Sequence, residues 1–211
     1  MNRILKSFAF AIAAFGVSVS AQAVTVSASA IGETTSNVAG VTTVTFDGNN
    51  CAGYASCTGD FAIVSGSASG LYATPYSDNS LYLSVPNPSQ STQTAVLGLG
   101  TTANYFGLFW GSIDTYNIIS FFLGNTEVAS YNGGQLPDLT ADGNQTAWSS
   151  NRYINFDFGA EKFDTVKITS HGYAFESDNH SFRAAVPEPT TLLLMGLGLF
   201  GLIAIRRFKP V

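Results

Sequence analysis

Charged residues are scarce in this 211-residue chain, where they make up 11% of the sequence, about half the usual share. Nine Lys and Arg stand against 14 Asp and Glu. Because binding to a nucleic-acid backbone needs clustered basic side chains, this composition argues against a nucleic-acid partner. Aromatic residues are plentiful, at 13%, which argues against a disordered chain. The sequence therefore predicts one folded domain of ordinary size that binds no nucleic acid.

Residues that commonly carry catalysis are also few. The chain contains two His and two Cys. No serine lies in the Gly-x-Ser-x-Gly pattern of a hydrolase nucleophile, and the His-Glu-x-x-His zinc motif is missing. Both histidines, His171 and His180, lie close to each other near the end of the expected domain. A catalytic triad is therefore not expected, and we predict that the protein is not an enzyme.

The first 23 residues have the three parts of a secretory signal peptide. Arg3 and Lys6 supply the positive start, residues 8–19 are apolar, and residues 21–23 form a small-x-small cleavage site. An N-terminal membrane helix is the alternative, but the apolar stretch is short for a hydrocarbon core of about 30 Å. We expect export, with residues 24–185 forming the folded domain.

A second apolar segment lies near the other end of the chain. Residues 190–205 carry no charge, and a helix over this range would be a marginal membrane span. The basic residues Arg206, Arg207 and Lys209 follow it, and we expect them to remain on the cytoplasmic side of the membrane.

The residues Pro187, Glu188 and Pro189 precede this segment, and the prolines favour an extended backbone at the membrane surface. The tripeptide, the glycine-bearing apolar segment and the terminal basic residues resemble the PEP-CTERM sorting signal of Gram-negative bacteria, over residues 186–211. The resemblance implies recognition by the membrane peptidase exosortase. It also implies a membrane-tethered precursor that leaves the inner membrane for the cell surface or the extracellular matrix. A plain single-pass anchor is the alternative.

The region between the two ends has the pattern of β-strands. Short stretches rich in Val, Ile, Phe, Tyr and Thr are separated by Gly, Asn, Asp, Ser and Pro. Within residues 153–158, Ile154, Phe156 and Phe158 fall on one face, as the two-residue period of a half-buried strand requires. Gly107 lies inside an apolar strand pattern, which marks a bulge or a close approach of neighbouring groups.

A hairpin is expected where residues 116–123 and 126–131 flank the dipeptide Gly124-Asn125, because glycine accepts a positive φ. Many such strands without crossover helices predict an all-β fold, an antiparallel β-sandwich of the jelly-roll kind. Of the charged residues, four basic and 13 acidic ones fall in residues 24–186, which gives this region a net charge of about −9. Such a surface favours solubility and repels polyanions.

A second resemblance concerns the domain itself. Residues 105–117, 151–156 and 174–179 resemble the core of a group of exosortase-dependent surface proteins. The Phe-Glu-x-Asp-Asn segment at 175–179 is also similar to the last strand of several carbohydrate-binding jelly rolls. This resemblance implies fold and location, and it implies no enzymatic activity.

The two cysteines, Cys51 and Cys57, are separated by five residues that include a glycine. An even number of cysteines in an exported chain predicts a disulfide. A ring this small would add roughly 2 kcal/mol of stability. The alternative, a metal site, needs more ligands than the flanking Asp47 and Asp60 supply.

Residues 138–144 match the opening of a calcium-binding loop. Asp138, Thr140 and Asp142 place oxygen ligands at alternate positions, and Gly143 allows the turn. Ser149 stands at position twelve, where such a loop has a bidentate Glu, so a plain turn between strands is the alternative.

The last expected strand offers a second set of oxygen ligands, because Glu176 and Asp178 share one face of it. Structural packing, contact with calcium or another ligand, and carboxylate catalysis are the three interpretations of this pair. A structural calcium ion is the one cofactor that the sequence suggests.

Aromatic side chains are the candidates for contact with a glycan. Trp148, in the polar loop 144–151, and Tyr153 are the residues singled out, although most aromatic residues fill a core. Taken together, the sequence predicts an exported, surface-sorted protein with a structural or adhesive role. The alternative is a module that binds extracellular polysaccharide.

Overall fold

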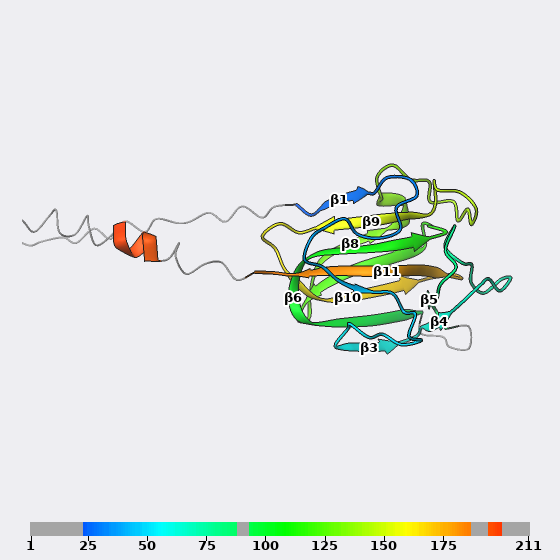
Figure 1. Cartoon of the computed structure of the whole chain (residues 1–211), viewed down its shortest axis with the longest axis horizontal. Coiled ribbons are helices and arrows are strands. Elements are labelled where there is room, and N and C mark those ends of the chain that lie inside the picture. Colours follow the sequence, from blue (N-terminus) through cyan, green and yellow to red (C-terminus); the bar gives the residue numbers. More distant parts are fainter. Residues whose placement is uncertain (1–22, 88–92, 187–193, 200–211) are drawn as a thin grey trace, which may run out of the picture.

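The computed structural model describes residues 23–87, 93–186 and 194–199 (Figure 1). The described part of the domain consists of strands and one short 3₁₀ helix, η1 (Gly133–Gln135). In chain order the strands are β1 (Thr25–Ala28), β2 (Thr42–Val44), β3 (Ser56–Gly59), β4 (Ala62–Val64), β5 (Tyr82–Val85), β6 (Thr94–Gly111), β7 (Asn117–Leu123), β8 (Thr126–Asn132), β9 (Arg152–Asp157), β10 (Phe163–Ser170) and β11 (Phe175–Ala184).

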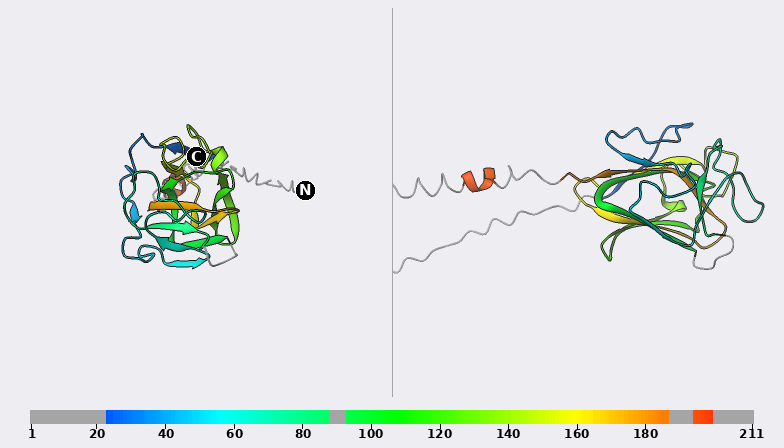
Figure 2. Two further views of the ribbon diagram at one scale, coloured as in Figure 1. Left: turned by 90° about the vertical axis from the view of Figure 1, so that its right-hand side faces the viewer. Right: turned by 60° about the horizontal axis from the view of Figure 1, so that its bottom comes forward.

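The strand β6 connects the whole architecture, because its 18 residues pair with four neighbours. Its first part, over residues 94–98, pairs with β3 and β10, and its second part, over residues 103–111, pairs with β9 and β11. The pairing path runs β4-β5-β11-β6-β10-β7-β8, and every pairing between the described strands is antiparallel. The prediction of an antiparallel all-β fold is therefore confirmed. Figure 2 shows how the strands curl around a common interior.

The core is aromatic, and it joins strands that do not all pair with one another. The ring of Phe121 on β7 lies 5.0 Å from that of Phe156 on β9 and 5.1 Å from that of Phe163 on β10. Phe106 on β6 lies 5.8 Å from the same Phe121 ring. All four side chains are fully buried. Edge-to-face and tilted pairs of this kind add packing energy to their large buried area, so this cluster holds the curled sheet closed.

The local predictions for the strands are confirmed. The strands β7 and β8 form a hairpin around the two residues Gly124 and Asn125, and Gly124 has φ +57°. The alternate residues Ile154, Phe156 and Phe158 are all fully buried. Gly107 is a close-approach glycine, because a Cβ at this position would lie 2.6 Å from the Tyr105 hydroxyl and 2.7 Å from the Tyr153 ring.

The start of β1 and the end of β11 lie at the same end of the domain (Figure 1). The predicted signal peptide lies outside the described residues except for Ala23, as do Pro187, Glu188, Pro189, Arg206, Arg207 and Lys209. Of the predicted helix over 190–205, only 194–199 is described, and it is helical. Among the described residues, no helix has the length and apolar character needed to cross a membrane.

The disulfide predicted between Cys51 and Cys57 is not formed in the structure, where both residues are free thiols. The loop does bring them together, because their side chains are hydrogen-bonded to each other. Burial raises the pKa of both thiols above the usual value of 9.0. Since the thiolate is the form that reacts, this burial leaves both sulfurs poorly reactive at neutral pH.

Candidate functional site

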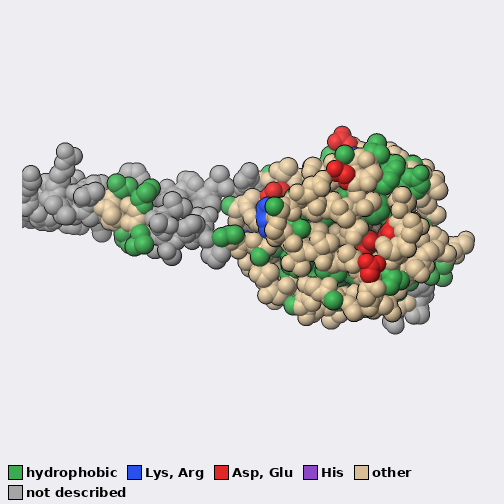
Figure 3. Space-filling view, viewed as in Figure 1, with side chains coloured by type: hydrophobic (Ala, Val, Ile, Leu, Met, Phe, Trp, Pro, Cys, Tyr) green, Lys and Arg blue, Asp and Glu red, His purple; other side chains and the backbone are tan. Residues whose placement is uncertain are grey.

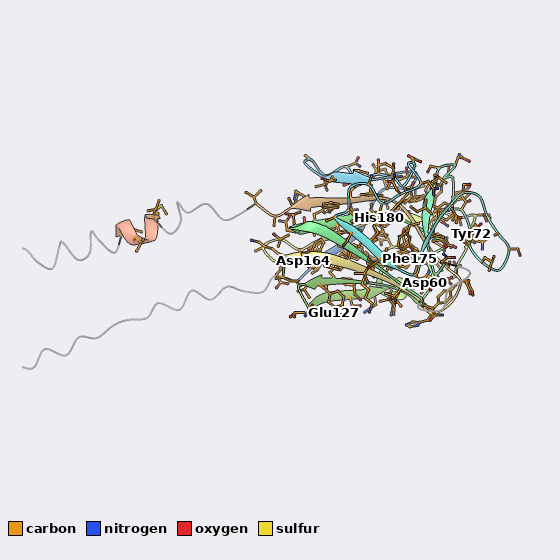
Figure 4. All side chains as sticks on the ribbon, turned by 90° about the horizontal axis from the view of Figure 1, so that it is seen from below. Asp60, Tyr72, Glu127, Asp164, Phe175 and His180 are labelled. Atoms are coloured by element: carbon orange, nitrogen blue, oxygen red, sulfur yellow. The ribbon has the colours of Figure 1, made fainter. Side chains whose placement is uncertain are left out.

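A cavity of about 590 Å³ lies among four segments of the chain. Its walls come from loop 67–73, the connection between β6 and β7, loop 142–145, and the beginning of β11 with the residues before it. The pairing of β11 with β6, in which Glu176 faces Gly111, brings these distant segments together. In Figure 4, the lining residue Tyr72 lies at the end of the domain opposite to the start of β1 and the end of β11. The cavity therefore lies at the end of the domain away from Ala23 and Val186.

Glu176 on β11 forms the floor of the cavity and is 1% exposed. Its Oε1 accepts a hydrogen bond from the Ala73 main-chain N–H at 2.8 Å, and its Oε2 lies 2.6 Å from the Ser112 hydroxyl. Burial raises the pKa of Glu176 to about 8, against the effect of these hydrogen bonds. The side chain is thus largely neutral at pH 7, when it can donate its own hydrogen to Ser112.

Two further carboxyl groups, Asp114 and Asp142, belong to segments that meet in a short antiparallel bridge. The side chain of Asp142 accepts hydrogen bonds from the Ser150 hydroxyl and from the Asn144 N–H, and these bonds lower its pKa. Burial raises the pKa of Asp114, and the charge of Asp142 acts in the same direction. The cavity therefore combines an ionised carboxylate with a neutral carboxylic acid.

Gly143 is required at its position beside Asp114. Its φ is +67°, and a Cβ here would lie 2.7 Å from Asp114 Oδ1 and 2.8 Å from Asp114 Oδ2. Any larger residue would meet both strain and a clash with the carboxylate. Together with Asp142, this glycine is a part of the predicted calcium loop that lines the cavity.

Three tyrosines supply the aromatic part of the wall. Tyr72 and Tyr116 are half-buried, and Tyr173 is 48% exposed. The Tyr116 hydroxyl donates to the Tyr173 carbonyl at 3.0 Å, which links two walls. Leu71, which is 37% exposed, adds an apolar contact at the rim. No Lys, Arg or His is among the described residues that line the cavity.

The structure brings together only part of the predicted oxygen-ligand residues. Asp142 and Glu176 line the same cavity, whereas Asp138, Thr140 and Asp178 do not line it. Asp138 and Thr140 are exposed, and the Thr140 carbonyl accepts from the Ser150 hydroxyl. Among the described residues, no group of three or more His, Cys, Asp or Glu side chains is arranged to hold a metal ion.

The two aromatic residues predicted to contact a glycan lie elsewhere. Tyr153 is fully buried and donates to the Asn179 carbonyl at 3.2 Å, so its ring is not available to a ligand. Trp148 is half-buried, with its ring 5.2 Å from that of Tyr76. Neither residue lines the cavity. The prediction for Tyr153 fails because this side chain is covered although it lies on the face of β9 opposite the core, so period-two alternation does not place it in solvent.

A buried polar network that the sequence did not reveal surrounds His180. Its Nδ1 lies 2.7 Å from the Tyr54 hydroxyl and its Nε2 lies 2.8 Å from the Ser177 hydroxyl. Figure 4 shows His180 within the domain. Burial lowers the pKa of His180 to about 3, so the ring is neutral. His180 and Ser177 are fully buried, so this network lies in the packed interior around β11.

The end of the domain at which β11 ends differs from the cavity in that it carries basic side chains. Lys162 and Arg183 line a smaller cavity of about 260 Å³ together with Val186. In Figure 3, the largest basic patch on the visible face lies at this end. Two of the four basic residues of the domain are therefore placed beside the start of the tail.

Residues 185–207 match the family model of the PEP-CTERM protein-sorting motif. No curated protein and no solved structure matches the chain. The chain thus carries a PEP-CTERM sorting motif, which marks an extracellular protein that is exported and processed by exosortase.

Replacing Pro187, Glu188 and Pro189 together with alanine is expected to block this processing, because the three residues lie in the segment that matches the sorting motif and the resemblance implies that exosortase recognises them. The intact mass of the protein in membrane and medium fractions reports the result. We expect the variant to keep its tail mass and to remain with the membrane. Equal amounts of processed variant and wild-type protein in the medium would contradict this role of the tripeptide.

Proposed function

We propose that this protein is a component of the cell surface or extracellular matrix that attaches to extracellular polysaccharide by binding sugar in the 590 Å³ cavity. The observation that carries the proposal is the composition of this cavity, in which three tyrosines and three carboxyl groups surround one space. A sugar ring has apolar C–H faces that pack on aromatic rings, and hydroxyl groups at its edge that donate to carboxylates. The cavity offers both kinds of partner.

The charge of the cavity favours a neutral sugar. Asp142 is ionised, and no basic residue among the described lining residues offsets its charge. The whole region 24–186 carries a net charge of about −9, which repels polyanions further. We therefore propose a neutral polysaccharide as the ligand, in preference to one that carries uronic acids.

Binding without catalysis is part of this proposal. Glycoside hydrolysis needs an acid whose proton reaches the leaving-group oxygen. Glu176 is the group with the raised pKa, but it is 1% exposed and both of its oxygens are engaged, by Ala73 and Ser112. This arrangement favours a structural floor to the cavity over a proton donor to a ligand.

Replacing Tyr173 with alanine is expected to weaken glycan binding at least about tenfold, because an exposed ring beside a ligand is lost. Binding is first found on a glycan array and then measured by titration calorimetry with the oligosaccharide that gives the strongest signal. Asp142→Asn is expected to weaken binding as well, since it replaces a charged acceptor with a neutral amide.

Matched controls are available outside the cavity. Leu123 is an exposed apolar residue, at 42%, and Asp138 is an exposed carboxylate, so Leu123→Ala and Asp138→Asn should leave the affinity unchanged. A protein that retains no glycan on the array, or that prefers uronic-acid polymers, would overturn the proposed function. Release of reducing sugar from a bound oligosaccharide would overturn the absence of catalysis.

A further inference from the structure

A second group of carboxylates lies outside the cavity, where loop 77–80 meets β11. Asp178 on β11 is 1% exposed. Its Oδ2 lies 3.1 Å from the Ser80 hydroxyl, whereas its Oδ1 is buried without a hydrogen-bond partner among the described residues. Burying a carboxylate oxygen without a hydrogen bond costs free energy. Such an oxygen therefore indicates a partner that is not among the described residues.

Asp78, in loop 77–80, also has a buried carboxylate oxygen without a hydrogen-bond partner among the described residues. Its Oδ1 accepts from the Ser80 main-chain N–H at 2.9 Å and also contacts the Ser80 hydroxyl. Its Oδ2 is buried and has no partner among the described residues. The Ser80 hydroxyl therefore lies between two carboxylates, but it has one hydrogen and can donate to only one of them. One of the two carboxylates therefore receives no hydrogen bond from the Ser80 hydroxyl.

Positive charge is missing as well. The nearby charges that act on Asp178 are those of Asp78 and Asp47, and both are negative. Asp47 is exposed at the edge of the group. The Ser80 hydroxyl thus contacts both carboxylates, and no positive charge of the described residues acts on Asp178.

We infer that Asp78 and Asp178 bind a calcium ion through their partnerless oxygens, Asp78 Oδ2 and Asp178 Oδ1. Calcium takes six to eight oxygen ligands in flexible geometry, and carboxylates, hydroxyls, main-chain carbonyls and water all serve. The described residues supply no group of three His, Cys, Asp or Glu side chains here, so main-chain carbonyls and water would have to supply the remaining ligands. Magnesium demands a stricter octahedron, and zinc prefers nitrogen and sulfur ligands.

The calcium ion would hold Asp78 against β11, and the segment just before Asp78 forms a wall of the cavity. Residues 67–73 line the cavity, and the same stretch of chain continues to Ser80. On β11, Glu176 and Asp178 are two residues apart, so both project from the same face of the strand. A calcium ion at Asp178 thus acts on the fold beside the cavity without occupying it.

Thermal unfolding of the exported protein tests this site. After treatment with EDTA and dialysis, addition of 10 mM calcium is expected to raise Tm by about 5 °C, as a site with a Kd of about 0.1–1 mM predicts. Asp178→Asn should abolish this rise. Asp78→Asn should do the same. Because Asp78 is only half-buried, this second variant is expected to fold, and it tests the site if the Asp178 variant does not fold. Asp138→Asn, in the loop that the sequence predicts as a calcium site, should keep the full response.

Calorimetric titration of the wild-type protein with calcium alone should give one site per chain, and neither variant should bind. The inference is overturned if calcium leaves Tm unchanged, in which case the two carboxyl groups share a proton instead. It is also overturned if 10 mM magnesium gives an equal shift, or if the Asp138 variant is the one that loses the response.

Discussion

Replacing Trp110 with alanine is expected to lower the free energy of unfolding by about 4 kcal/mol and Tm by on the order of 10 °C. Trp110 lies on β6, is fully buried, and stacks on Phe175 of β11 with ring centroids 4.1 Å apart. Truncation to alanine removes this stack and leaves a cavity where the two strands meet. Urea denaturation followed by circular dichroism measures the loss.

Trp110→Phe is the matched control for this prediction. The indole Nε1 of Trp110 is buried without a hydrogen-bond partner among the described residues, so phenylalanine removes an unsatisfied donor while keeping an aromatic ring against Phe175. We expect a loss below about 2 kcal/mol. A cost of less than about 1 kcal/mol for the alanine variant would show that the β6–β11 stack does not support the fold.

The features of the fold that could be predicted from the sequence are the local ones. The hairpin between β7 and β8 depends on two turn residues, and the burial of Ile154 and Phe156 depends on a two-residue period within one strand. Both are encoded in neighbouring residues. The all-β class can also be predicted from the sequence, because the pattern of short strands is repeated along the chain.

The cavity could not be predicted, because its residues meet only through long-range pairing. Tyr72, Asp114, Asp142 and Glu176 come from four segments that β11 and β6 bring together. Asp142 and Glu176 could be found as isolated candidates, but no pattern in the sequence says that they share one space. The pairing register that places Glu176 opposite Gly111 is a property of the assembled sheet.

The burial of Tyr153 is a second feature that could not be predicted from the sequence. Alternation assigns it to the face of β9 opposite the core, and this face would be solvent in a simple sandwich. In the structure, Tyr105 packs beside it on β6, and the Tyr105 hydroxyl lies 2.7 Å from the Ser36 hydroxyl in the segment between β1 and β2. A covering segment of this kind carries no periodic signal. The sequence therefore could not show that Tyr153 is buried.

Glu176→Gln is expected to remove a strong dependence of stability on pH. The pKa of Glu176 rises from an ordinary 4.5 to about 8 in the folded protein, chiefly because of burial. Between these two values the folded state holds a proton that the unfolded state has released, so the free energy of unfolding falls as pH rises. At about 1.4 kcal/mol per pH unit, the wild-type protein should lose about 4 kcal/mol relative to the glutamine variant between pH 5 and pH 9.

Glutamine suits this test because it has the shape of the neutral acid and can retain its contacts. Its oxygen can accept from the Ala73 N–H, and its amide can donate to the Ser112 hydroxyl. Urea denaturation at each pH, with EDTA present, compares the two proteins. His180 and Asp178 also have shifted pKa values, but both are present in each protein, so the difference between the two curves reports Glu176. Parallel curves from pH 5 to pH 9 would mean that Glu176 ionises at its ordinary pKa, and that the floor of the cavity is charged rather than neutral.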